Sequence, residues 1–135
     1  MDVNGLETTV ITVRDAGFGT HSALHTSNNN FLYDPAGGFP HSEMGSGDFV
    51  EGVSLAEYVN YHLEKGSTIE LAFLPTSTAQ ELNIQDRAIE QGGAIGGFCT
   101  VATSNALGGV FGIPQGVYFP GNLANSAREA ATRSQ

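Results

Sequence analysis

The 135-residue chain is predicted to fold as a single α+β domain. Three short segments with strand signals follow one another near the N-terminus and are joined by short turns, which favours an antiparallel meander. Segments with helical periodicity and capping signals then dominate the second half. A hydrophobic content of 40% with 14% charged residues is typical of a globular domain with a buried core. No internal repeat or long linker divides the chain.

The strands are predicted from alternation and from the turns between them. Residues 8–14 (TTVITVR) alternate β-branched side chains, and residues 21–26 continue as a second strand after a turn at residues 15–19. That second strand carries His21 and His25 on one face. Three asparagines at residues 28–30 predict the next turn, and residues 31–34 a third strand ended by proline.

Helices are predicted from capping boxes and apolar spacing. Residues 35–53 are rich in glycine, proline and serine and are expected to form a surface loop. Four helices and one further strand are expected after it. The helices span residues 55–65 after a capping box at Ser54, about 79–91 after a second box at Thr78, 99–107, and 122–133, and the strand spans residues 68–74.

Charge and cysteine content exclude several functions. The net charge is −9 with only five Lys and Arg residues, so nucleic acid would be repelled. No apolar run approaches the roughly 18–20 residues that span a bilayer, and residues 1–5 lack the features of a secretion signal. The single cysteine allows no internal disulfide and no cysteine-rich zinc site, and we expect no metal and no cofactor.

The candidate nucleophile is that cysteine, Cys99, which follows the glycine-rich residues 92–97 at the start of a helix. Backbone N–H groups and the helix dipole favour a thiolate there. His21 is the candidate base, and Asp34, at the end of the neighbouring strand, could orient its imidazole. Two other interpretations stay open: Cys99 could simply be buried, and Asp34 could only end a strand-terminating turn. The backbone N–H of Cys99 is the candidate oxyanion donor.

The remaining histidines are weaker candidates. His25 is the reserve base, although a half-exposed strand histidine is the simpler interpretation. His41 and His62 are expected on the surface. The glycine pairs before Cys99 match no phosphate-binding motif, so they are interpreted as tight turns that allow a substrate to approach.

The order of these parts resembles a known superfamily. A histidine on an early strand, the turn YDPAGG at residues 33–38, and a Phe98-Cys99 helix start resemble the circularly permuted papain-like proteins. These include permuted NlpC-type amidases and lecithin:retinol acyltransferase-like proteins, and the likeness spans about residues 8–122. It implies a papain-like fold with Cys99 as nucleophile, His21 as base and Asp34 as the third residue. It also implies a thioester acyl-enzyme formed from an amide: a peptide bond, a peptidoglycan amide or a glutamine side chain.

A second resemblance concerns the N-terminus. Residues 2–6 (DVNGL) are similar to the Asp-Pro-x-Gly-Leu sequence that closes the core of Rhs polymorphic toxins, with Val3 in place of proline. This implies that residues 1–7 are a core remnant and residues 8–135 a toxin domain. Such domains are delivered into rival bacteria, often by a type VI secretion system, and a cognate immunity protein neutralises them. The sequence leaves open whether the toxin domain would act in the periplasm or in the cytoplasm of the target cell.

Two alternatives use the same residues differently. The Cys–His pair could serve an acyltransferase or phospholipase, as in the lipid-acting branch of the superfamily. The domain could also be a non-enzymatic binding module in which Cys99 is structural.

Overall fold

The computed structural model describes residues 6–15, 19–37, 39, 48–93 and 98–134. These residues form an α+β fold with a five-stranded antiparallel sheet and four α-helices, which confirms the predicted fold class. The strands are β1 (Thr8–Asp15), β2 (Gly19–Thr26), β3 (Phe31–Tyr33), β4 (Phe49–Val50) and β5 (Thr68–Leu74). The helices are α1 (Leu55–Glu64), α2 (Thr78–Gln91), α3 (Cys99–Leu107) and α4 (Pro120–Arg133).

The sheet has the order β4-β3-β2-β1-β5, and every neighbouring pair is antiparallel. The predicted meander β1–β2–β3 is confirmed, and β5 adds to the opposite side of β1. Residues 35–53 were expected to form only a loop, and this expectation is wrong near the C-terminal end of the segment. Phe49 and Val50 make β4, because they return to pair with Tyr33 and Leu32 of β3.

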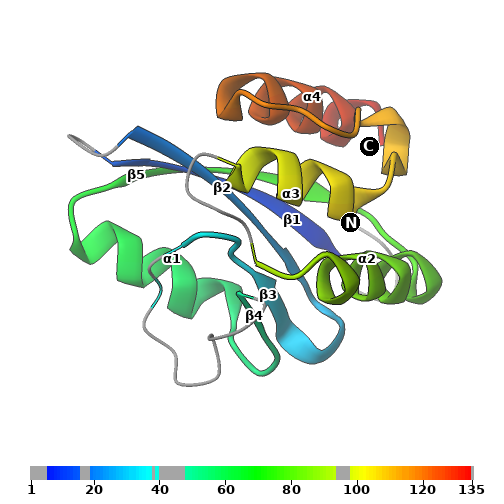
Figure 1. Ribbon diagram of the computed structural model, residues 1–135, viewed down its shortest axis with the longest axis horizontal. Coiled ribbons are helices and arrows are strands. Elements are labelled where there is room, and N and C mark those ends of the chain that lie inside the picture. The colour runs from blue at the N-terminus through cyan, green and yellow to red at the C-terminus, as the bar shows by residue number, and fades with distance from the viewer. Residues whose placement is uncertain (1–5, 16–18, 38, 40–47, 94–97, 135) are drawn as a thin grey trace.

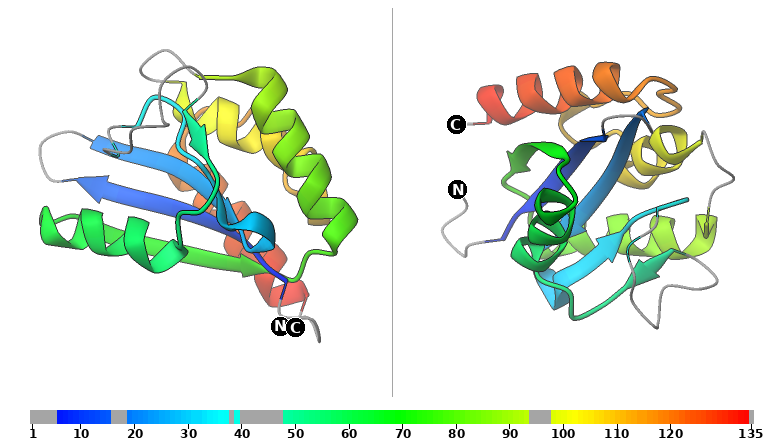
Figure 2. Two further views of the ribbon diagram at one scale, coloured as in Figure 1. Left: turned by 90° about the horizontal axis from the view of Figure 1, so that it is seen from below. Right: turned by 90° about the vertical axis from the view of Figure 1, so that its left-hand side faces the viewer.

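Helices cover both faces of the sheet (Figures 1 and 2). Helix α1 packs on one face, where Tyr58 meets strand residues such as Ile11 and Ala23. Helices α2, α3 and α4 share the other face, where their small apolar residues pack against Leu24 and Leu74. Strand alternation separates these two cores, since neighbouring residues of one strand point to opposite faces.

Helix starts follow capping chemistry, with one difference from the prediction. The side chain of Ser54 accepts a hydrogen bond from the backbone of Glu57, as expected for the N-cap of α1. Helix α2 is capped by Ser77 and not by Thr78, because Ser77 and Gln80 form the capping box. Helix α4 begins two residues earlier than predicted, with Pro120 in its first turn.

Strand β3 is short, and this shapes the site. It pairs only with residues 24–26 of β2, because the chain turns away after Tyr33. In that turn the backbone N–H of Gly37 donates to the carbonyl of Asp34 at 2.9 Å. The first half of β2 therefore has an edge that β3 does not cover, and α3 packs against it.

Some predictions fall outside the described residues. These are residues 1–5 of the Rhs-like junction predicted at residues 1–7, residues 16–18 of the turn predicted at residues 15–19, His41, and residues 94–97 of the glycine-rich stretch.

Candidate active site

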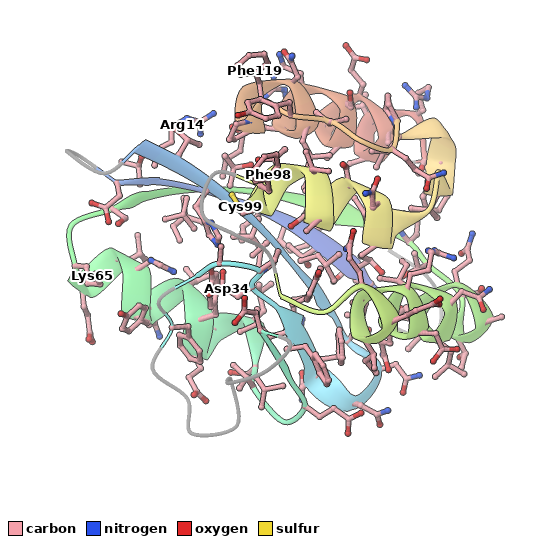
Figure 3. All side chains as sticks on the ribbon, in the orientation of Figure 1. Arg14, Asp34, Lys65, Phe98, Cys99 and Phe119 are labelled. Carbon is pink, nitrogen blue, oxygen red and sulfur yellow. The ribbon has the colours of Figure 1, made fainter. Side chains whose placement is uncertain are left out.

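Helix α3 binds the uncovered edge of β2 through Ser22. The backbone N–H of Ser22 donates to the sulfur of Cys99, and Thr103 Oγ1 donates to the Ser22 carbonyl at 3.3 Å. The Ser22 hydroxyl is also 2.9 Å from Thr100 Oγ1. Helix residues therefore make the bonds that a neighbouring strand would make, and they fix Cys99 beside β2 at its uncovered edge (Figure 3).

The structure brings Cys99, His21 and Asp34 together. Asp34 follows β3, so the register of Leu24 with Tyr33 makes it a diagonal neighbour of His21 across the two strands. His21 Nε2 lies 2.5 Å from Asp34 Oδ1. The imidazole is also hydrogen-bonded to the thiol of Cys99, and Asp34 occupies Nε2, which leaves Nδ1 for the sulfur.

Two residues hold Asp34, which is fully buried. The Tyr58 hydroxyl donates to Asp34 Oδ1 at 2.8 Å, and burial, together with the nearby Asp34 charge, raises the pKa of Tyr58 well above 10.0. Gly37 lies against the other carboxylate oxygen, since a Cβ at this glycine would stand 2.0 Å from Asp34 Oδ2. The carboxylate is thus fixed by a donor on one side and by close packing on the other.

The electrostatics favour a thiolate–imidazolium pair. Burial opposes protonation of His21, but its hydrogen bonds to Asp34 and Cys99 outweigh this and raise the pKa to about 10. Burial also tends to raise the pKa of Cys99, whereas the hydrogen bond and charge of His21 lower it from 9.0 to about 7. Between these two values the sulfur is anionic while the imidazole still carries a proton that it can donate.

These residues open into a cleft of about 500 Å³. Its lining includes the polar residues Asp15, His62 and Lys65 and the ring-bearing residues Tyr118, Phe119 and Pro120. Cys99 and His21 both line the cleft. The volume lies within the range of pockets that bind small ligands or short segments of a larger substrate.

The other two described histidines differ from their predictions. His25 is buried rather than half-exposed: its Nε2 donates to the Val53 carbonyl at 2.8 Å, and burial lowers its pKa. It is absent from the cleft lining. His62 was expected on the surface, but only 7% of it is exposed. It lines the cleft, neither ring nitrogen has a hydrogen-bond partner, and burial lowers its pKa.

Sequence reasoning missed three residues of this site: Ser22, Tyr58 and His62. Tyr58 and His62 are four residues apart in α1, so they share the helix face that packs on the sheet. That spacing was a readable signal for burial, although not for contact with Asp34. Ser22 carried no comparable signal, because its role depends on where β3 ends.

Within the described residues, no cluster of three or more His, Cys, Asp or Glu side chains could hold a metal ion. In the same part of the chain, no helix combines the length and apolar character needed to cross a bilayer.

Comparison with known proteins adds no neighbour: no family model, curated protein or solved structure matches this chain.

Proposed function

We propose that this domain is a cysteine hydrolase that cleaves an amide bond with Cys99 as nucleophile. The observation that carries the proposal is the set of contacts around His21. One ring nitrogen is hydrogen-bonded to the buried carboxylate of Asp34, and the other is hydrogen-bonded to Cys99, the only cysteine in the sequence. A base between a nucleophile and an orienting carboxylate is the arrangement that acyl transfer requires.

The reaction runs in two halves. The Cys99 thiolate attacks the amide carbonyl, and the developing oxyanion is stabilised by the N–H of Cys99 at the start of α3, where helix N–H groups lack internal partners. The His21 imidazolium then gives its proton to the leaving nitrogen, the C–N bond breaks, and a thioester forms. Neutral His21 next takes a proton from water, which attacks the thioester and releases the acid and the thiolate.

Asp34 orients His21 throughout both halves. Its bond to Nε2 keeps Nδ1 directed at the sulfur, and its negative charge stabilises the imidazolium that donates the proton. Tyr58 is a positioning residue, because it acts on the reaction only through Asp34.

The biological setting is part of the same proposal. The chain order of histidine before cysteine, and a helix that starts at Cys99 beside an antiparallel sheet, support a permuted papain-like enzyme. The resemblance of residues 2–6 to an Rhs core junction supports a role as an antibacterial effector domain, carried by a larger protein and countered by an immunity protein. The substrate would then be a protein or peptidoglycan of the target cell.

Bacterial growth tests this proposal directly. The domain is expressed in the cytoplasm, or with an export signal, as the wild type, Cys99→Ala and His21→Ala. We expect the wild type to stop growth in one of the two compartments and both variants, folded by circular dichroism, to be harmless. Equal growth of all three would contradict the proposal, and variants as toxic as the wild type would show that toxicity does not need the Cys–His pair.

A further inference from the structure

Three large aromatic side chains are exposed next to the nucleophile. Phe98, Tyr118 and Phe119 have exposed fractions of 48%, 53% and 62%. They form a continuous edge-to-face series, with ring centroids 5.9 Å apart for Phe98–Tyr118 and 5.2 Å apart for Tyr118–Phe119. We call these three residues the aromatic wall. Aromatic groups that gather on a surface and stay exposed to water are typical of a binding site.

The aromatic wall belongs to the catalytic cleft. Tyr118 and Phe119 line the same cavity as Cys99, and Phe98 immediately precedes the nucleophile. In Figure 3 the side chains of Phe98 and Phe119 lie on the same side of Cys99. A group bound against this wall is therefore beside the bond that the thiolate attacks.

The wall is held in place by α3 itself. The backbone N–H of Val117 donates to Ser104 Oγ at 2.9 Å, and that of Gly116 donates to Asn105 Oδ1 at 2.8 Å. At the last residue of the wall, the carbonyl of Phe119 accepts the first backbone hydrogen bonds of α4. The segment is thus fixed relative to Cys99, as a preformed specificity surface requires.

The charge of the domain distinguishes between two possible ligands of the aromatic wall, a membrane lipid and a polypeptide. A membrane lipid would bring an anionic surface toward a domain of net charge −9 that has five basic residues. The lining of the cleft also includes polar side chains, among them Asp15, His62 and Lys65, which can contact the backbone or polar groups of a peptide. An extended polypeptide can contact both the aromatic wall and these polar groups, whereas an acyl chain can make favourable contacts only with the wall.

We infer that the aromatic wall binds a large apolar side chain of a polypeptide substrate, adjacent to the amide that Cys99 attacks. This inference rests on the proposed function and narrows its substrate class. This large apolar side chain would cover the exposed rings, and the burial would favour such substrates over ones with small residues at the same place.

Two cysteine reagents test the inference without a known substrate. Chloroacetyl-phenylalaninamide and chloroacetyl-glycinamide differ only in the side chain. In both, the thiolate attacks the chloromethyl carbon, a C–S bond forms and chloride leaves, so mass spectrometry reports modification of the single cysteine. For the wild type we expect the phenylalaninamide reagent to react about 10-fold faster, because one aromatic ring is buried in its complex.

Alanine variants test whether the faster reaction of the phenylalaninamide reagent depends on the aromatic wall. Phe119→Ala and Tyr118→Ala should each bring the ratio of the two rate constants toward one. Phe73→Ala is the matched control, since Phe73 is an exposed aromatic residue (44%) of β5 that does not line the cleft, and it should keep the full ratio. An unchanged ratio in both wall variants, or a ratio near one in the wild type, overturns the inference.

The absolute rates and a lipid experiment separate the other outcomes. A wild-type rate no higher than that of a free thiol peptide contradicts the proposed function, while the ratio still reports on the wall. Sedimentation of the wild type with phosphatidylglycerol vesicles, lost in Phe119→Ala, would overturn the assignment to a polypeptide and favour a lipid.

Discussion

Replacing Asp34 by asparagine is expected to raise the pKa of Cys99. Asparagine has the size of aspartate and keeps an oxygen for the Tyr58 hydroxyl, but it removes the negative charge next to His21. The imidazolium then has a neutral partner at Nε2 instead of an anionic one, and the thiolate in turn loses part of the stabilisation that this cation supplies.

The size of the expected fall in Cys99 reactivity follows from two pKa values of the thiol. Its pKa is about 7 in the folded domain and 9.0 without perturbation, a difference that corresponds to about 3 kcal/mol. At about pH 7, a thiol with a pKa of about 7 is half ionised, whereas a thiol with the unperturbed pKa is only about 1% ionised. The loss of thiolate in the variant is therefore at most about 50-fold. A more basic thiolate is also a better nucleophile, so the rate should fall by about 5- to 50-fold.

The assay is alkylation of Cys99 by iodoacetamide between about pH 5 and about pH 10. We expect the wild-type rate to rise with a midpoint at about pH 7 and that of Asp34→Asn to rise at a clearly higher pH. Glu70→Gln is the matched control, because Glu70 is a carboxylate outside the cleft lining that pairs with Arg14. The same midpoint in Asp34→Asn and the wild type would refute a role for Asp34 in setting the reactivity of Cys99.

Three further substitutions test the surroundings of the site. Tyr58→Phe removes a buried hydrogen bond to a carboxylate and should lower the free energy of unfolding in urea by about 1.5–3 kcal/mol, whereas a change below about 0.5 kcal/mol would contradict that role. Gly37→Ala should displace Asp34 and raise the alkylation midpoint as Asp34→Asn does. Gly121→Ala is its control, since a Cβ there meets nothing within 4 Å, and equal midpoints in both variants would contradict the packing argument. His62→Phe removes two unpartnered buried nitrogens and should raise Tm by a few degrees, because an unsatisfied buried polar group costs about 1–3 kcal/mol; a lower Tm would show that both nitrogens are satisfied.

The regular elements of the fold were predictable because their signals are local. Alternation in residues 8–14 and the turn residues after them identify the meander before any tertiary contact is considered. The start of α2 shows the limit of this reasoning. Two overlapping capping boxes, at Ser77 and Thr78, compete in the sequence. Ser77 caps the helix, while Glu81 of the other box is buried and accepts hydrogen bonds from Thr76 and Asn28.

The site was predictable only in part. The positions of Cys99 at a helix start and of His21 and Asp34 on adjacent strands were sufficient to suggest their proximity. The rest depends on long-range packing. The contact of Tyr58 with Asp34 requires α1 to cross the sheet face, and the contacts of Ser22 require β3 to end early. Neither event has a local pattern in the chain.

In the proposed mechanism, His21 holds Cys99 as a thiolate at neutral pH. A titration of the ultraviolet absorbance of the thiolate, with Cys99→Ala as the blank, measures this directly because the chain has one cysteine. We expect a midpoint at about pH 7 in the wild type. In His21→Ala the midpoint is expected to be clearly higher, because burial still raises the pKa of the thiol while only the hydrogen bonds of Ser22 and Thr100 remain to lower it. A wild-type midpoint near 9.0, unchanged by His21→Ala, would contradict this mechanism.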